Sequence, residues 1–248
     1  MYAVETHALC KDFAGFRAVN AVDLALESGM VHALVGPNGA GKTSLFNLLT
    51  GFLAPSSGRM VLFGEDLTGA RPDQIAKRGI ARSFQITSLF EELTVFEHVA
   101  LALQSRTDLG YRFWTSDGAL RRFDPSARLL LEQVGLGELA DRPARQLPYG
   151  QKRALELALA LALEPRLLLL DEPTAGMSAL DVQRTIALVG RIRAGRTVVL
   201  VEHNMGVVAE LAENVIVLQQ GRVIAQGPYD LVKRDAAVVA AYLGQVDA

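Results

Sequence analysis

The sequence predicts an α/β fold in which a core of strands and helices carries an inserted helical lobe. Segments typical of strands lie at both ends of the chain, and segments with helical periodicity fill the middle, from about residue 95 to 163. A glycine-rich loop also joins a buried strand to a helix near residue 40. Because the strands are split by one helical block, the insertion is placed at roughly residues 87–165.

The individual elements follow from their side-chain periodicity. Residues 3–9 and 19–26 alternate apolar and polar side chains, as half-buried strands do, and Val31–Val35 is a continuous apolar run. Further strands are expected at 59–63, 80–84, 167–170, 198–201 and 215–218. Helices are expected at 43–53, 95–103, 125–134, 150–163, 180–192 and 205–212.

Composition excludes several classes of protein. The chain of 248 residues is 50% hydrophobic and has a net charge of -2, which argues against a disordered chain and a bulk nucleic-acid binder. A single cysteine, Cys10, excludes an internal disulfide framework and a zinc site built from several cysteines. No signal peptide is expected, and no apolar stretch approaches the roughly 20 residues that a spanning helix needs.

A phosphate-binding loop is predicted directly after the strand Val31–Val35. The segment that matches the motif G-x-x-x-x-G-K-[ST] in full is Gly36, Pro37, Asn38, Gly39, Ala40, Gly41, Lys42 and Thr43, and Ser44 follows it. Its glycines let successive N–H groups point at phosphate oxygens, and the helix that follows adds positive charge at its N-terminus. Lys42 is expected to reach the β- and γ-phosphates, and the Thr43 hydroxyl to hold Mg²⁺.

Two acidic residues end the apolar run at 167–170. Ligands bind at the carboxyl ends of parallel strands, so Asp171 and Glu172 are expected at the same edge as the phosphate loop. Asp171 is placed to coordinate Mg²⁺ through water, and Glu172 to act as a general base on the attacking water. Alone, such a pair is equally consistent with the solvated start of a loop; the phosphate loop favours the catalytic interpretation.

With these two motifs in place, the sequence resembles an ATP-binding cassette (ABC) ATPase over nearly its whole length. Leu147-Pro148-Tyr149-Gly150-Gln151 stands where that family has its L-S-G-G-Q signature, about 20 residues before Asp171. The resemblance implies a P-loop NTPase (RecA-like) core with an antiparallel β subdomain and an inserted α-helical subdomain. The core is expected at 1–86 and 166–248, and the helical subdomain at 87–165.

The resemblance also implies roles for scattered residues. Gln85 resembles the glutamine that contacts Mg²⁺ and adjoins the surface that receives the transporter, and His203 resembles the switch histidine that contacts the γ-phosphate. Asp181 lies in the match to the loop that crosses to the partner subunit. Phe13, 29 positions before Lys42, matches the aromatic residue that stacks on adenine, with Phe16 as the alternative.

Two residues depart from the family signature. Pro148 replaces a serine whose hydroxyl meets the γ-phosphate across the dimer, and proline has neither a hydroxyl nor an N–H. Tyr149 replaces the first glycine. Contacts to ATP from this segment would then come from backbone N–H groups around Gly150 and Gln151, at the start of the next helix.

The resemblance implies a transport ATPase with several partners. Two cassettes would enclose ATP and Mg²⁺ head to tail, with a heterodimer favoured over a homodimer, and would drive transmembrane permease subunits on the cytoplasmic face of the cell membrane. A substrate-binding protein is also expected, and nucleic acid is not. A non-transport cassette ATPase and a small-molecule kinase are the alternatives from other classes. A non-transport cassette ATPase tends to have two cassettes or a long coiled-coil insertion, and neither is indicated by this sequence. A small-molecule kinase would not need the signature segment that this sequence carries.

Some segments resemble one group more closely. Arg82-Ser83-Phe84-Gln85, residues 89–95, residues 201–205 and the closing Ala241-Tyr242-Leu243-Gly244 are similar to the ATP-binding subunits of branched-chain amino acid importers. Relatives that serve urea or amide import, or lipopolysaccharide export, share many of these features. Import of a branched-chain or related amino acid is therefore the favoured expectation.

Overall fold

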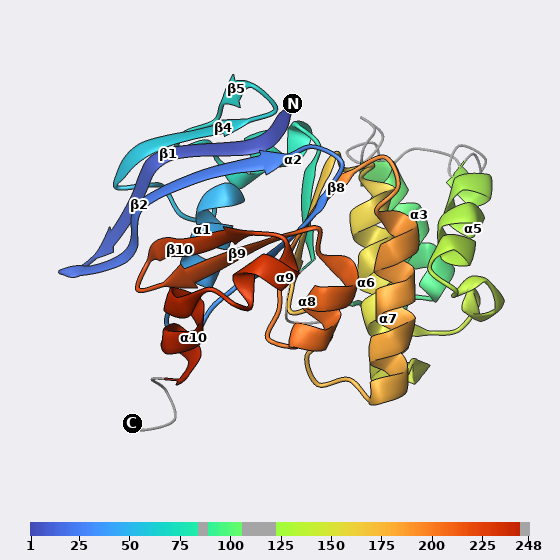
Figure 1. The fold of residues 1–248 in the computed structure, drawn as a ribbon. Helices are drawn as coiled ribbons and strands as arrows, with labels where there is room; N and C mark the ends of the chain where they lie inside the picture. The colour runs from blue at the N-terminus through green and yellow to red at the C-terminus, as the bar shows by residue number, and fades with distance from the viewer. Residues whose placement is uncertain (84–88, 106–122, 244–248) are drawn as a thin grey trace. The chain divides into compact units, whose positions relative to one another are not determined.

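The computed structural model describes residues 1–83, 89–105 and 123–243 (Figure 1). The chain forms two compact units. Unit 1 consists of Met1–Arg82, Arg166–Glu172 and Arg193–Ala248, and unit 2 of Ser83–Pro165 and Pro173–Ile192. The domain boundaries expected from the sequence remain a prediction; unit 2 additionally takes in the helix that ends at Ile192.

Unit 1 begins with an antiparallel sheet. Its strands are β1 (Tyr2–Phe13), β2 (Phe16–Glu27), β4 (Ser57–Leu62) and β5 (Glu65–Asp66), in the order β2-β1-β4-β5. The alternation predicted for 19–26 is present, because Val22, Leu24 and Leu26 are buried while the residues between them are exposed. The two strands predicted in this region are longer than expected, since they continue as a hairpin to the pair Phe13 and Phe16.

A second sheet is mixed. It contains β3 (Val31–Val35), β6 (Ile80–Ser83), β7 (Leu167–Asp171), β8 (Thr197–Val201), β9 (Asn214–Gln219) and β10 (Arg222–Gly227), in the order β10-β9-β3-β8-β7-β6. β3 pairs in parallel with β8 and β9, and β7 with β8. Every residue of β3, β7 and β8 is buried, as their apolar runs predict. Their carboxyl ends therefore meet at one edge of the sheet.

Five helices described in unit 1 accompany these sheets. They are α1 (Lys42–Leu49), α2 (Pro72–Lys77), α8 (Met205–Leu211), α9 (Tyr229–Val232) and α10 (Ala236–Leu243). Leu45, Phe46 and Leu49 of α1 belong to a core cluster that includes residues of both sheets. Burying one side chain of this size stabilises the folded state by about 1.5–3 kcal/mol. Helix α9 packs on β9 and β10, and α10 on β10 (Figure 1).

The prediction that the first helix extends to residue 53 was wrong. Helix α1 ends at Leu49 because Gly51 takes a left-handed conformation, with φ of 74°, that terminates helices. The Thr50 hydroxyl also donates to the Phe46 carbonyl at 2.8 Å, closing the last turn. The short elements β5, α2, α9 and α10 and the strand β10 were not predicted.

Unit 2 is helical in its described part. Its helices are α3 (Val95–Ser105), α5 (Asp124–Gln133), α6 (Tyr149–Ala162) and α7 (Ala179–Ile192), with short 3-10 turns η3 (Gly137–Leu139) and η4 (Ala144–Gln146). Contacts among α3, α5, α6 and α7 form its interior. Across the described ranges of the chain, none of the helices has the length and apolar character needed to cross a bilayer.

Candidate nucleotide-binding site

The loop between β3 and α1 comes so close to other backbone that two of its glycines cannot be replaced without a shift. A Cβ at Gly36 would lie 2.1 Å from the Leu218 carbonyl oxygen, and one at Gly41 would lie 2.3 Å from that of Ala18. Gly41 is the N-cap of α1, with φ of 101° and no side-chain cap. The first N–H groups of α1 are therefore open to an anion.

A cavity of about 290 Å³ in unit 1 collects most of the predicted site. It is lined by the end of the β1–β2 hairpin, the loop and two strand ends: Phe16, Ala18, Asn38, Gly39, Ala40, Gly41, Lys42, Thr43, Ser44, Glu172 and His203. The aromatic residue on its wall is Phe16. Phe13, the residue predicted to stack on adenine, is not among these lining residues, and the Lys11 ammonium lies 5.2 Å from the centre of its ring.

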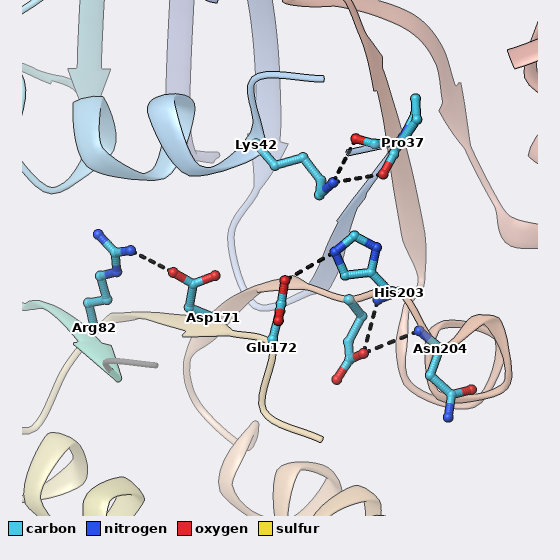
Figure 2. A network of polar contacts seen from close by, with 9 residues as sticks. Pro37, Lys42, Arg82, Asp171, Glu172, His203 and Asn204 are labelled. Atoms are coloured by element: carbon cyan, nitrogen blue, oxygen red, sulfur yellow. Dashed lines mark hydrogen bonds and ion pairs between the residues drawn. The ribbon is translucent and has the colours of Figure 1, made fainter. Parts of the chain in front are cut away.

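Lys42 is buried and folds back onto its own loop. Its ammonium donates to the carbonyl oxygens of Gly36 at 2.7 Å and Pro37 at 3.0 Å (Figure 2). Burial lowers the pKa of Lys42, while the nearby carboxylates of Glu172 and Asp171 act to raise it. The hydrogen bonds that the Lys42 ammonium makes to Gly36 and Pro37 are therefore to neutral carbonyls, which charged phosphate oxygens in the cavity could replace.

The two predicted acids follow each other at the end of β7 but have different environments. Asp171 is buried, and its Oδ2 lies 2.6 Å from the Nη2 of Arg82. Glu172 has a positive φ of 46°, which is strained for a residue with a side chain, and its N–H donates to the Val201 carbonyl at 3.0 Å. This conformation turns the chain sharply, and Glu172 lines the cavity.

His203 forms a pair with Glu172. Its Nε2 lies 3.0 Å from the Glu172 Oε1, and both side chains are partly exposed (Figure 2). The buried Glu202 fixes the turn that carries His203, because its Oε2 accepts from the N–H groups of His203 at 3.1 Å and Asn204 at 3.3 Å. Asn204 in turn caps α8 by accepting from Gly206 at 3.0 Å.

Sequence reasoning missed the supporting roles of Arg82 and Glu202. Both lie within segments that resemble the branched-chain amino acid importer group, but neither spacing nor residue type alone indicates their partners. Gln85, which was predicted to contact Mg²⁺, lies outside the described residues.

The signature segment, residues 147–151, lies in unit 2. Pro148 is the N-cap of α6 and supplies no side-chain cap, while Gly150, Gln151 and Asp181 line a cavity of about 450 Å³ within this unit. The Tyr149 hydroxyl donates to the Ala175 carbonyl at 3.3 Å. The phenol therefore binds the chain's own loop.

Comparison with known proteins identifies the family. The model of the ABC transporter family matches residues 19–175, more than half of the chain. The chain belongs to this family. A second model, described as branched-chain amino acid ATP-binding cassette transporter, matches residues 222–248 of this ABC protein.

Curated relatives align with the ABC chain from end to end. It is 38% identical to the high-affinity branched-chain amino acid transport ATP-binding protein BraF of Pseudomonas aeruginosa, with 98% of each chain covered. It is 35% identical to LivG of Escherichia coli K12, again with 98% of each covered. The probable LivG of Archaeoglobus fulgidus is 32% identical, covering 100% of this chain and 97% of that one.

Solved structures confirm the predicted fold class. The ADP conformation of an ATP-binding cassette of an ABC transporter superposes with a TM-score of 0.87 at 30% identity, covering 98% of this chain and 99% of that one. A nucleotide-free cassette superposes with a TM-score of 0.85 at 29% identity over the same shares. The chain is therefore an ABC ATPase subunit, an enzyme that binds and hydrolyses nucleotide.

Proposed function

We propose that this ATPase powers the import of branched-chain or related amino acids through partner membrane subunits. The observation that carries the enzymatic part is the cavity that joins the phosphate loop to the Glu172–His203 pair. The observation that carries the transport part is the full-length similarity to BraF and LivG, together with the C-terminal match at 222–248.

The residues at the sheet edge fit a Mg²⁺ ion. Thr43 offers a hydroxyl oxygen and Asp171 a carboxylate, which are ligands that Mg²⁺ prefers. Such an ion is held by one or two protein oxygens together with substrate phosphates and water, rather than by an all-protein cage. When bound, Mg²⁺ neutralises charge on the transferred phosphoryl group. Gln85 is proposed as a further ligand.

Hydrolysis is proposed to use Glu172 as the general base. Its carboxylate takes a proton from water as the water oxygen bonds to the γ-phosphorus and the bond to the β-γ bridging oxygen breaks, releasing ADP. The Nε2 of His203 already lies 3.0 Å from this carboxylate. Entry of the γ-phosphate gives His203 a second acceptor beside the same base. Lys42 exchanges its two carbonyl partners for phosphate oxygens, which are stronger acceptors because they are charged.

Adenine is proposed to stack on the aromatic end of the β1–β2 hairpin. The ring of Phe13 was the sequence expectation, and Phe16 lines the cavity. Phe13→Ala and Phe16→Ala separate the two. Loss of the ring that stacks on adenine should weaken ATP binding and reduce the preference for ATP over a triphosphate without a base, whereas loss of the other ring should not.

Two cassettes are proposed to close around ATP, the second one a different chain. Gly150, Gln151 and Asp181 would then act across the interface, with backbone N–H groups at the start of α6 replacing the missing serine hydroxyl. A similar solved structure, 25% identical with a TM-score of 0.75 and 91% and 98% coverage, is described as a dimeric post-hydrolysis state bound to ADP and Pi. Permease subunits and a substrate-binding protein complete the proposed importer at the cytoplasmic face of the membrane.

Uptake of labelled leucine tests this function. Source cells would carry the native chain, Lys42→Ala, or Lys77→Ala, which changes an exposed lysine at the end of α2. High-affinity uptake should be lost in Lys42→Ala and retained in Lys77→Ala. If uptake persists in Lys42→Ala while the purified native protein hydrolyses ATP, the amino acid assignment fails and the ATPase remains. Urea, amides and exported lipids are then the substrates to test.

A further inference from the structure

The catalytic scheme above gives no role to Arg82, whose charged side chain is nearly buried. Arg82 lies on β6, and its side chain is 10% exposed. Its Nη2 donates to the Asp171 Oδ2 at 2.6 Å, and its Nη1 donates to the Asn47 Oδ1, also at 2.6 Å. The guanidinium carbon lies 5.7 Å from the centre of the Phe46 ring.

These contacts connect three elements that build the site. Asp171 ends β7, whereas Asn47 and Phe46 belong to α1, whose first residue is Lys42. A guanidinium is planar and presents its N–H groups in fixed directions, so two such bonds restrict the position of both partners. Arg82 therefore ties the Asp171 carboxylate to the helix that follows the phosphate loop.

On the basis of the function proposed above, we propose that Arg82 is a positioning residue for the Mg²⁺ site. By engaging Oδ2 of Asp171, Arg82 fixes the rotamer of a side chain that is 7% exposed. The second carboxylate oxygen then lies on the side away from Arg82 (Figure 2). That oxygen is the one left to receive a metal-bound water. The hydrogen bond from Arg82 to Asn47 of α1 also fixes the position of this oxygen relative to Thr43 on the same helix.

Charge and orientation predict opposite effects of removing Arg82. A nearby positive charge repels a divalent cation, so charge alone makes any neutral replacement favour Mg²⁺. Loss of the two directed hydrogen bonds frees the carboxylate and disfavours Mg²⁺. Arg82→Lys separates the effects, because lysine keeps the charge and lacks the planar fork.

The test compares ATP affinity in Mg²⁺ with affinity in EDTA, by calorimetry on the full chain. For Arg82→Lys we expect the Mg²⁺ concentration for half-maximal tightening to rise about 10-fold, with affinity in EDTA unchanged. Asn47→Ala should shift it in the same direction by less, because Arg82 and its bond to Asp171 remain. The control is Arg78→Lys, which changes an exposed arginine paired with Glu65 at 2.6 Å and should alter neither affinity.

Two outcomes in the variants would overturn the positioning role alone. An unchanged Mg²⁺ requirement in Arg82→Lys and Asn47→Ala would exclude it, and equal weakening with and without Mg²⁺ would leave Arg82 a purely structural residue. In both cases the proposed ATPase mechanism stands. Native protein whose ATP affinity ignores Mg²⁺ would instead reject the Mg²⁺ assignment of Asp171 and Thr43, and this inference with it. If Arg82→Lys does not fold, Asn47→Ala decides alone.

Discussion

The phosphate loop and the signature segment are two motif regions of this chain whose residues are constrained by different physical causes. The loop matches its motif in full, and a Cβ at Gly36 would overlap the backbone of a neighbouring strand. The signature segment departs from the family at Pro148 and Tyr149, and it begins a helix whose N–H groups need no particular side chain. Backbone crowding thus fixes residue identity in the loop, whereas a helix start tolerates substitution.

The largest expected effect concerns ATP hydrolysis, which should depend on Glu172 of unit 1 whatever residues occupy the signature segment. Glu172→Gln should slow hydrolysis by about 10²–10⁴-fold, because an amide cannot take the proton from water. ATP binding should persist, as measured by calorimetry beside phosphate release. Glu210→Gln, which changes an exposed carboxylate on α8, is the matched control. Normal turnover in Glu172→Gln would remove Glu172 as the base.

A second test sets one motif glycine against the other. Gly36→Ala should cost about 3 kcal/mol or more of unfolding free energy, from overpacking against Leu218 and a φ of 148° that alanine disfavours. Gly150→Ala should change it by about 0.5 kcal/mol or less. There the new methyl meets the Asp181 carboxyl at 3.1 Å, which is the end of a side chain and not backbone, and alanine favours the helix. Equal losses in urea unfolding would contradict the comparison.

The same distinction explains how much the sequence could predict. The phosphate loop, Asp171 and Glu172 were predictable because a motif or a strand end fixes their geometry locally. The partner of Asp171 was not predictable, because Arg82 lies 89 positions away and meets it only through the strand order of the sheet. Strand β10 was missed for a similar reason: its residues are only half-buried, and pairing with β9 defines it.

The wall of the cavity gives a further example. Spacing to Lys42 pointed to Phe13, whereas the hairpin places Phe16 among the lining residues. Spacing along a chain cannot predict which of two aromatic residues at a hairpin end faces a loop, because the register and twist of the strands decide it.

A smaller effect is expected from restoring the signature serine. Pro148→Ser should strengthen ATP-driven association about tenfold, since a hydrogen bond to a charged group contributes about 1.5 kcal/mol. Association would be measured by size-exclusion chromatography in the Glu172→Gln background, with the partner cassette where one is required. Pro148→Ala, which also lacks a hydroxyl, is the control. Identical association in all three proteins would mean that backbone donors suffice.

The smallest expected effect concerns the strand that leads into the phosphate loop. His32 on β3 is buried, with its Nε2 2.9 Å from the Glu27 carbonyl oxygen and its Nδ1 3.0 Å from the Asn214 Nδ2. The neutral ring with hydrogen on Nε2 satisfies both contacts. Protonation would turn Nδ1 into a donor facing an amide that also donates. Burial is the main cause that lowers the pKa of His32 below its ordinary value of 6.5.

Because the unfolded chain then binds more protons than the folded one, the free energy of unfolding should fall as pH drops below about 6.5. His32→Gln should flatten this dependence by at most about 1.4 kcal/mol per pH unit, whatever its effect on stability at neutral pH. Urea unfolding at several pH values measures the slope, and His7→Gln, which alters an exposed histidine, should keep the native slope. If His32→Gln also keeps the native slope, the buried imidazole of His32 does not cause the loss of stability at low pH.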